Sequence, residues 1–318
     1  MFGVLPLTLA AFASGTLPPL QNVPPIPLVA AEQPPIPDEA FGLGDLASRM
    51  TVPVSIAGRG PYQFIVDTGA QRTVVSHDLA GFLGLEAGRK VRVTAMTNVA
   101  TVGTFMVPSL QLGKRVAAPI ESPALDQANM GAPGMLGIDA LQGHAVLIDF
   151  GRNEMTVRPS STRSHPSYGD NEIVVTAKSR FGQLIVTDAR YHGKRISVVI
   201  DTGTPITVAN SAFVRMLGKP PKSLGKISML SALGHLLVAD YIEVDHLEIG
   251  GVGLDRVPLA VADAEPFKRF DLDQTPALML GMDTLRLFKQ VDIDFANRQI
   301  RFKFPVRNLA LGAWSVTR

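Results

Sequence analysis

The tripeptide Asp-Thr-Gly occurs twice in this chain, as Asp67-Thr68-Gly69 and as Asp201-Thr202-Gly203. Each copy follows a mostly hydrophobic run, at residues 62–66 in the first case and at residues 196–200 in the second. This pattern is typical of a strand that delivers one carboxylate to a tight glycine turn. Two such turns can place two carboxylates against each other, and carboxylates that share one proton can activate a water molecule.

Four further matches in the same order make the two halves of the chain an internal repeat. The matched pairs are Thr73-Val74 with Thr207-Val208, Leu83-Gly84 with Leu217-Gly218, Met135-Leu136-Gly137 with Met279-Leu280-Gly281, and Ile148-Asp149-Phe150 with Ile293-Asp294-Phe295. The offset between the halves grows by about ten residues along the chain, which indicates extra loop residues in the second half. The repeat predicts two lobes of the same architecture.

These motifs resemble those of the pepsin and retropepsin aspartic proteases. In that family each lobe contributes a hydrophobic-hydrophobic-Asp-Thr-Gly turn, and a hydrophobic-hydrophobic-Gly element braces the turn. The bracing elements here would be Met135-Leu136-Gly137 and Met279-Leu280-Gly281. The resemblance covers roughly residues 45 to 305. It implies an all-β fold of two homologous acid-protease-type β-barrel lobes that form an intramolecular pseudo-dimer.

The resemblance also implies an aspartic-type endopeptidase whose catalytic pair is Asp67 and Asp201. A water molecule would lie between the two carboxyl groups and attack the peptide carbonyl. The ionised carboxylate would take a proton from this water, and the protonated one would hydrogen-bond the carbonyl oxygen. Because water is the nucleophile, we expect no cofactor and no metal, and the substrate would be a peptide or a protein.

Seven residues around the pair are expected to support it. Gly69 and Gly203 would let the backbone pass close to the partner motif and adopt turn dihedrals that are denied to other residues. By the resemblance, Thr68 and Thr202 cross-brace the two loops through hydrogen bonds. Gly137 and Gly281 would permit close packing behind the loops.

The seventh supporting residue, Thr204, follows the second motif, whereas Ala70 follows the first. A hydroxyl group at this position can donate to the neighbouring carboxylate and favour its charged form. We therefore expect Asp201 to be the more readily ionised carboxylate and Asp67 to hold the shared proton more often.

Family members close a β-hairpin flap over the cleft, and two segments are candidates for this role here. They are residues 94–103, around Thr97 and Asn98, and residues 228–237, around Ala232-Leu233-Gly234. Both segments follow their motifs at a similar distance, so we expect two flaps.

The elements that must position these residues follow from alternating hydrophobicity and turn signals. Residues 51–66 predict a β-hairpin with a turn at residues 58–61, and residues 183–200 repeat it with a turn at 192–194. Short helices are expected near 77–84 and 211–217. Further strands are expected near residues 90–96, 101–107, 145–150, 154–158, 227–231, 236–249, 290–295 and 299–304.

Two other pairs of carboxylates occupy matched positions in the halves. We expect Asp139 and Asp283 to hydrogen-bond the backbone near the start of a helix, a structural role. Asp149 and Asp294 are expected at strand ends for similar turn reasons.

Composition excludes several other classes of protein. The 30 basic and 28 acidic residues are nearly balanced and form no long basic run, so nucleic acid is not expected as a partner. The chain has no cysteine, which excludes disulfides and thiol catalysis. Its six histidines show no metal-ligand spacing.

We expect a leader over residues 1–40, an N-terminal lobe over 41–159, a linker over 160–170, a C-terminal lobe over 171–308 and a tail over 309–318. The first 37 residues contain nine of the 24 prolines and no lysine or arginine. Their apolar stretch, residues 2–13, indicates a signal peptide followed by a proline-rich tether, and hence export to a periplasm or outside the cell. A disordered apolar leader without export is the alternative. No uninterrupted apolar stretch is long enough for a membrane span.

Two alternatives to a monomeric protease remain open. The same fold could serve as a non-catalytic peptide-binding module, a pseudo-protease. Each half could also pair with the matching half of another chain, which would give a dimer with the same chemistry. The sequence indicates no side-chain preference for the substrate.

Overall fold

The computed structural model of this protein describes residues 40–42, 44–46, 49–113, 115–160, 172–180, 182–304 and 315–317. The expected leader (1–40), linker (160–170) and tail (309–318) lie almost wholly outside these residues. The described residues belong to one compact unit. Within it we call residues 49–160 the first lobe and residues 172–304 the second lobe.

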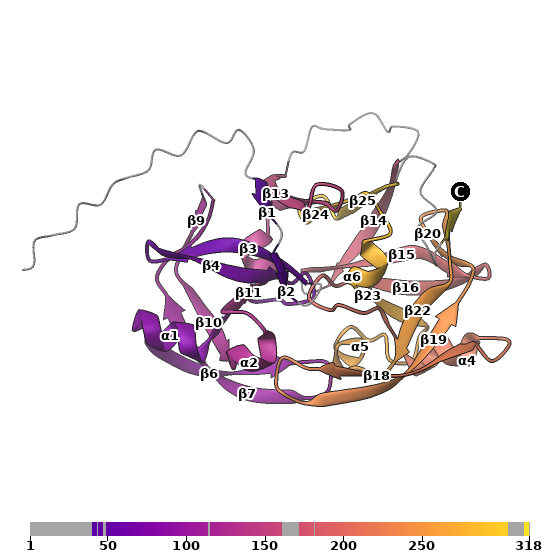
Figure 1. Ribbon diagram of the computed structural model, residues 1–318, viewed down its shortest axis with the longest axis horizontal. Helices are drawn as coiled ribbons and strands as arrows, with labels where there is room; N and C mark the ends of the chain where they lie inside the picture. Colours follow the sequence, from indigo (N-terminus) through magenta and orange to yellow (C-terminus); the bar gives the residue numbers. More distant parts are fainter. Residues whose placement is uncertain are drawn as a thin grey trace, which may run out of the picture. The chain divides into compact units, whose positions relative to one another are not determined.

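The described residues are mostly β, and their strands form a sheet of ten strands and a sheet of sixteen (Figure 1). The ten-stranded sheet contains β2 (Gly44–Leu46), β3 (Arg49–Ile56), β4 (Arg59–Val66), β5 (Val74–Ser76), β6 (Glu86–Thr94), β7 (Val99–Val107), β8 (Leu110–Leu112), β9 (Arg115–Ala117), β10 (Ile120–Leu125) and β11 (Gly134–Leu136).

The sixteen-stranded sheet contains β1 (Ala40–Gly42), β12 (His144–Asp149), β13 (Glu154–Pro159), β14 (Glu172–Arg180), β15 (Gln183–Tyr191), β16 (Lys194–Ile200), β17 (Val208–Ala209), β18 (Lys222–Leu230), β19 (Leu236–Val244), β20 (Leu247–Ile249), β21 (Val252–Asp255), β22 (Val257–Val261), β23 (Ala277–Leu280), β24 (Gln290–Asp294), β25 (Gln299–Lys303) and β26 (Ser315–Thr317). Six short helices connect the strands in the described residues. They are α1 (His77–Leu83), α2 (Gln127–Met130), α3 (Ile138–Leu141), α4 (Ser211–Met216), α5 (Glu265–Arg269) and α6 (Met282–Leu285).

The expected repeat is visible in the pairing of strands. In the first lobe β11 pairs in parallel with β4, and β10 pairs in parallel with β5. In the second lobe β23 pairs in parallel with β16, and β22 pairs in parallel with β17. The two lobes therefore have the same local topology, which confirms the expected all-β pair of homologous lobes.

Neither sheet closes into a barrel, so the expectation of barrel-shaped lobes is wrong in this respect. The path of the ten-stranded sheet runs from β6 to β9, and that of the larger sheet runs from β1 to β18. The end strands β6 and β18 each belong to a long hairpin, with β7 and β19 respectively. These hairpins extend over a cavity instead of pairing with the far edge of their own sheet.

The two lobes share the strands β13-β12-β24-β25 in the larger sheet. The central pairing is antiparallel, between β12 of the first lobe and β24 of the second, with Ile148 opposite Val291. Both of these side chains are fully buried, and Arg158 forms an ion pair of 2.6 Å with Asp292 across the same strands. Backbone hydrogen bonds thus join the lobes on the side away from the hairpins (Figure 1).

Most strands and both helices that the sequence predicts are confirmed. Ser76 caps α1, since its hydroxyl accepts a hydrogen bond of 3.0 Å from the amide of Leu79, and Asn210 caps α4 in the same way. The predicted strand over 236–249 is two strands, β19 and β20, because the chain turns between them at His246, whose φ is 58°. Helices α3 and α6 begin next to Asp139 and Asp283, where a helix start was expected, whereas α2 and α5 were not predicted, because runs of four or five residues carry little periodic signal.

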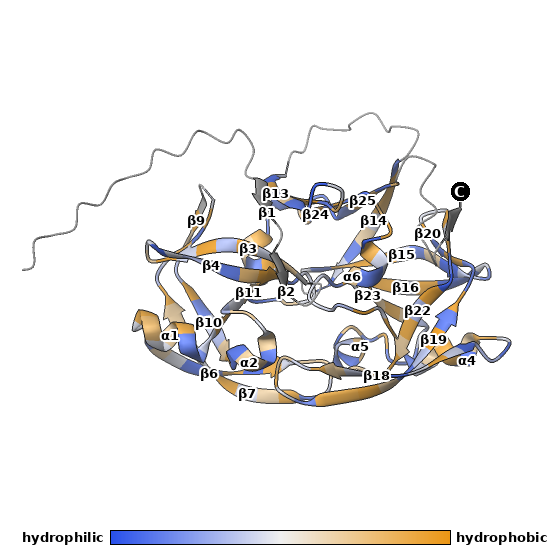
Figure 2. Ribbon diagram, viewed as in Figure 1, coloured by the Kyte–Doolittle hydropathy of each residue, from blue (hydrophilic) through white to orange (hydrophobic). Residues whose placement is uncertain are grey.

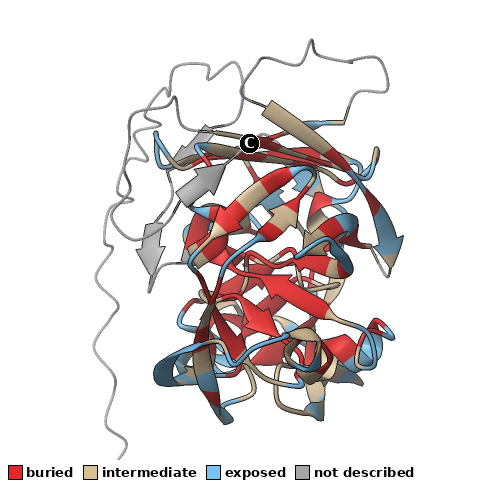
Figure 3. Ribbon diagram, turned by 90° about the vertical axis from the view of Figure 1, so that its right-hand side faces the viewer, coloured by how far each residue is buried: buried red, intermediate tan, exposed pale blue. Residues whose placement is uncertain are grey.

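Hydrophobic and hydrophilic residues are interleaved along the strands (Figure 2), and the buried ones gather on the inner strands of both lobes (Figure 3). Val52, Val54 and Ile56 on β3 are all buried, as their alternation predicts. None of the helices in the described part of the chain has the length and apolar content of a membrane span.

Shortening a buried side chain of the shared strands should cost stability. We expect Val146→Ala in β12 to lower the free energy of unfolding by about 2 kcal/mol, because Val146 is fully buried and loses about two methyl groups of contact. Urea unfolding measures this change. The matched control is Val116→Ala, since Val116 is 64% exposed and its loss should stay within about 0.5 kcal/mol. Equal losses would contradict the role given to the shared strands.

Candidate active site

Each Asp-Thr-Gly loop begins where a buried strand ends. Strand β4 leads into Asp67, and strand β16 leads into Asp201. The amide of Asp67 donates to the carbonyl of Leu136 at 2.9 Å, and the amide of Asp201 donates to the carbonyl of Leu280 at 3.1 Å. The predicted bracing elements, β11 and β23, are thus hydrogen-bonded to the loops.

The two threonines exchange hydrogen bonds between the lobes. The hydroxyl of Thr68 donates to the carbonyl of Ile200 at 2.9 Å and accepts from the amide of Thr202 at 3.1 Å. Reciprocally, the hydroxyl of Thr202 donates to the carbonyl of Val66 at 2.7 Å and accepts from the amide of Thr68 at 3.1 Å. Both threonines are buried, so water does not compete for these bonds.

The glycines of the motifs are needed for space. A Cβ atom on Gly69 would lie 2.7 Å from Cγ of Asp201, and one on Gly203 would lie 2.3 Å from Cγ of Asp67. Either atom would displace the partner carboxyl group. Neither glycine has a positive φ, so the expectation that they need unusual turn dihedrals is wrong.

The bracing glycines are needed for the same reason. A Cβ atom on Gly137 would lie 2.4 Å from the carbonyl carbon of Arg72, and one on Gly281 would lie 2.5 Å from that of Ile206. Because these neighbours are backbone atoms, they could not move aside cheaply. The close packing behind the loops therefore depends on both glycines.

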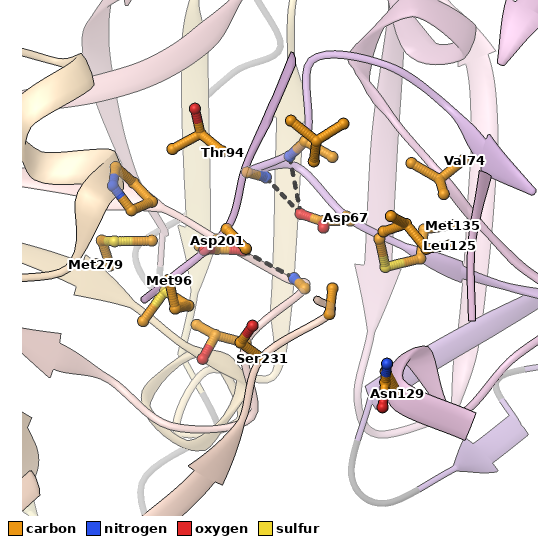
Figure 4. A pocket seen from close by; sticks show the side chains of 18 of the residues that line it. Asp67, Val74, Thr94, Met96, Leu125, Asn129, Met135, Asp201, Ser231 and Met279 are labelled. Atoms are coloured by element: carbon orange, nitrogen blue, oxygen red, sulfur yellow. Dashed lines mark hydrogen bonds between the residues drawn. The ribbon is translucent and has the colours of Figure 1, made fainter. Parts of the chain in front are cut away.

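The two carboxyl groups face each other but differ in environment (Figure 4). One oxygen of Asp67 accepts hydrogen bonds from the amides of Gly69 at 2.8 Å and Ala70 at 2.9 Å. Asp201 likewise accepts from the amides of Gly203, at 2.9 Å, and Thr204, but it is 6% exposed, whereas Asp67 is half-buried. Burial raises the pKa of the Asp201 carboxyl group well above its usual range, and the neighbouring charge of Asp67 raises it further.

The expectation that Asp201 ionises more readily than Asp67 loses the donor on which it rested. The hydroxyl of Thr204 donates to the carbonyl of Ile206 at 3.1 Å, so it does not serve as the donor that the sequence suggested for Asp201. Burial raises the pKa of Asp201, which is opposite to the direction expected for it, and the two carboxyl groups titrate as one coupled pair.

The other matched carboxylates have structural roles, as expected. Asp139 accepts hydrogen bonds from the amide and the hydroxyl of Thr73, at 2.8 and 2.7 Å. Asp283 does the same for Thr207, at 3.0 and 2.7 Å. Asp149 and Asp294 accept from backbone amides three residues later, at 3.0 and 2.9 Å, and so close the turns after β12 and β24.

A cavity of about 460 Å³ opens in front of the pair. Val74, Leu125 and Met135 of the first lobe line one side of it, and Met96 and Met279 line the other side (Figure 4). Its size and largely apolar walls are those of a site that binds an organic ligand. Asp67 and Asp201 are the acidic residues among the described side chains that line it.

The first candidate flap is the β6–β7 hairpin. Thr97 and Asn98 lie in its turn, where the Thr97 hydroxyl donates to the side chain of Asn98 at 3.2 Å. The cavity wall is formed by the residues just before them, from Val91 to Met96. The carbonyl of Met96 accepts a hydrogen bond of 3.0 Å from the amide of Glu265 in the second lobe, and its side chain packs against the apolar core of that lobe.

The second candidate flap is the β18–β19 hairpin of the second lobe, whose turn extends to the first lobe. Leu233 packs against first-lobe residues that include Met130 and Ala132. Gly234, whose φ is 82°, lies so close to Asn129 of the first lobe that a Cβ atom would be 2.8 Å from its side-chain nitrogen. Both predicted hairpins therefore cover the cavity, and each turn rests on the opposite lobe.

Gln183 is a residue of the site that was not predicted from the sequence. Gln183 in β15 is 2% exposed and lines the cavity. Its side-chain nitrogen donates to the carbonyl of Gly69 at 2.6 Å, which ties the first loop to the second lobe. Residues before the hairpin turn at 192–194 carry no motif, so no sequence signal distinguished Gln183 from other strand residues.

No group of three or more histidine or acidic side chains in the described part of the chain could hold a metal ion. Among the described residues, the lining of the cavity includes the two carboxyl groups, three arginines, Gln183 and many apolar side chains.

Two family models match the chain, one in each lobe. A model described as "gag-polyprotein putative aspartyl protease" matches residues 52–143, and a model described as "Aspartyl protease" matches residues 187–284. Each match includes one Asp-Thr-Gly loop and one of the hairpins that cover the cavity. Together the matches cover more than half of the chain. A comparison with curated proteins found no match.

The hydroxyl of Thr202 can be removed with little change of shape. We expect Thr202→Val to lower the free energy of unfolding by about 1–3 kcal/mol, because the amide of Thr68 loses its buried acceptor. Thr202→Ser keeps the hydroxyl and should lose clearly less. Urea unfolding of the three proteins measures the difference. Equal stability of Thr202→Val and wild type would show that the exchange does not hold the lobes.

The raised pKa of Asp201 predicts a pH-dependent stability. Between the unfolded value of about 3.9 and the raised folded value, the folded protein binds a proton that the unfolded chain has lost. The stability of the wild type relative to Asp201→Asn should therefore fall as pH rises through this range. Urea unfolding from about pH 3 to about pH 7 compares them.

Asp263 provides a control of opposite sign. Hydrogen bonds from the hydroxyl and amide of Ser211 hold the pKa of Asp263 below its usual range. The wild type should therefore gain stability relative to Asp263→Asn as pH rises. Parallel pH profiles of wild type and Asp201→Asn would contradict the raised pKa of Asp201.

Proposed function

Because the chain belongs to the retropepsin-like aspartic protease family, with two protease domains in one chain, we propose that it is an aspartic-type endopeptidase. The observation that supports this most strongly is the pair Asp67 and Asp201, set at the base of a covered cavity with the pKa of Asp201 raised. Unequal pKa values allow one carboxyl group to act as a base while the other acts as an acid.

In this mechanism Asp67 is the base. It is the more exposed carboxyl group, so its charged form is better solvated, while both carboxyl groups accept hydrogen bonds from backbone amides. A water molecule between the carboxyl groups transfers a proton to Asp67 as its oxygen bonds to the peptide carbonyl carbon. Asp201 donates its proton to the carbonyl oxygen, so the tetrahedral intermediate is neutral at that oxygen.

Collapse of the intermediate reverses these transfers. The carbonyl re-forms as its hydroxyl proton returns to Asp201, the carbon–nitrogen bond breaks, and the proton on Asp67 moves to the leaving amine. The carboxyl groups end in their starting protonation states, with one water consumed. The threonine exchange keeps both groups in register throughout, because it lies in the loops themselves.

The two hairpins cover the cavity in which the reaction would take place. Both line the cavity in which the carboxyl groups lie, so a bound peptide would be surrounded by β6–β7, β18–β19 and the loops. Exclusion of water strengthens the hydrogen bonds to the reacting carbonyl. A peptide in extended form suits such a cavity, since strand edges line it on several sides.

We also propose that one chain is sufficient for activity and that the protein is exported. The first is supported by the contact of both loops within one chain. The second is supported by the apolar, proline-rich residues 1–37, which lie outside the described residues. If one chain is sufficient, activity should be proportional to enzyme concentration. If the protein is exported, it should be recovered from a non-cytoplasmic cell fraction.

Replacement of either carboxyl group should abolish cleavage. We expect Asp67→Asn and Asp201→Asn to lower kcat/KM on a broad peptide library by about 10³-fold or more between about pH 3 and 8, because each removes one proton-transfer group. Mass spectrometry of the products measures cleavage. Asp240→Asn is the matched control, since Asp240 forms an exposed ion pair with Lys226 outside the cavity. Peptide binding by a folded wild type without turnover would instead favour the non-catalytic module.

A further inference from the structure

Three arginines line the cavity at positions whose equivalents in the sequence repeat carry no charge. Arg72, Arg92 and Arg269 all line it. They belong to three segments that are far apart in the sequence. The repeat allows each one to be compared with its counterpart in the other lobe.

The counterpart of Arg72 is Ile206. Each residue stands five positions after the aspartate of its motif, and each has its carbonyl carbon against the bracing glycine of its lobe, at 2.4 and 2.5 Å from the position of an added Cβ atom. Both residues line the cavity. The backbone is therefore equivalent at the two positions, and the side chains differ in charge.

The counterparts of the other two arginines are also uncharged. Arg92 stands two residues before the end of β6, and Ser228 stands two residues before the end of β18 in the matching hairpin. Arg269 ends α5, whereas α2, the corresponding helix of the first lobe, presents Asn129 to the cavity.

The three arginine-bearing segments enclose the same part of the cavity. Arg269 donates a hydrogen bond to the side chain of Gln71, the residue before Arg72. Arg72 in turn donates to the carbonyl of Glu121, whose carboxylate binds Arg89 on β6. The turn after β6 is hydrogen-bonded to α5 through Met96 and Glu265. Loop, hairpin and helix are thus joined into one wall.

In the first lobe, the charges of Arg72 and Arg92 are not neutralised by an ion pair within the described part of the chain. The lining carboxyl groups are Asp67 and Asp201, which share a proton and so contribute about one negative charge. A guanidinium group carries five N–H donors in a planar fork that matches a carboxylate.

We infer that this wall selects peptides with an aspartate or glutamate side chain on one side of the cleaved bond. The inference rests on the proposed endopeptidase and adds its substrate class. The uncharged positions at Ile206, Ser228 and Asn129 supply no matching site on the other side. Substrate acidity should therefore be required on one side of the cut, with Arg72, Arg92 and Arg269 as the specificity-determining residues.

The first experiment uses a peptide library with both termini blocked, so that side chains are the source of every carboxylate. Wild-type cleavage at about pH 6 should show acidic residues enriched on one side of the cut. A glutamate peptide chosen from this set is then compared with its glutamine version. The ratio of their kcat/KM values should shrink in about 1 M salt, where charges are screened beyond about 3 Å.

Each substitution of the double variant introduces the residue that the matching position of the other lobe holds. Arg72→Ile with Arg92→Ser should lower the glutamate-to-glutamine ratio of kcat/KM by about tenfold or more, since charged hydrogen bonds are lost. Arg195→Ser, which removes an exposed arginine of β16 that does not line the cavity, should leave the ratio unchanged. Equal enrichment of acids on both sides, or an unaltered ratio in the double variant, would overturn the inference.

Binding separates this inference from the proposed catalysis. Fluorescence anisotropy with the Asp201→Asn protein measures affinity for the same two peptides without turnover. Tighter binding of the glutamate peptide that disappears on adding Arg72→Ile and Arg92→Ser supports the arginine wall even if the wild type cleaves nothing. Equal affinity for both peptides counts against the wall even if the wild type is an active protease.

Discussion

The reciprocal exchange of hydrogen bonds between Thr68 and Thr202 is the constraint on which the site depends. Each hydroxyl group donates to a backbone carbonyl of the opposite lobe and accepts from a backbone amide of that lobe. The two loops are thus joined by four buried hydrogen bonds. The carboxyl groups follow directly from this arrangement, because each aspartate is covalently next to its threonine. Gly69 and Gly203 cannot carry a side chain, because the carboxyl group of the partner aspartate occupies the space that a Cβ atom would need.

The lobes also contact each other on two opposite sides of these loops. On one side β12 and β24 pair in one sheet, so the lobes share backbone hydrogen bonds. On the other side the two hairpins cross, with Met96 resting on the second lobe and Leu233 on the first. The carboxyl pair lies between a rigid sheet and two long hairpins. Motion is therefore easier on the hairpin side, where fewer hydrogen bonds join the lobes.

Much of this could be predicted from the sequence, because the repeat presents the same signals twice. The paired motifs, the bracing glycines and the hairpins before and after them are local patterns with local physical reasons. The direction of the Thr204 hydroxyl was not predictable, since a carbonyl two residues later competes with the carboxylate for its proton. Gln183 and Arg269 were missed because their relation to the loops exists only after the lobes have come together. The prediction of closed barrels was wrong because the sequence carries no signal for the order of strands beyond the hairpins.

Joining two unequal lobes in one chain has a consequence for the direction in which a peptide lies. Two identical lobes would create a site with exact twofold symmetry, and a peptide could then bind in either orientation with the same free energy. Here Arg72 holds the position in the first lobe that Ile206 holds in the second, so in the proposed endopeptidase the two orientations of one peptide would differ in energy. In the proposed endopeptidase, the amino-terminal and carboxyl-terminal sides of a bond would therefore meet different side chains.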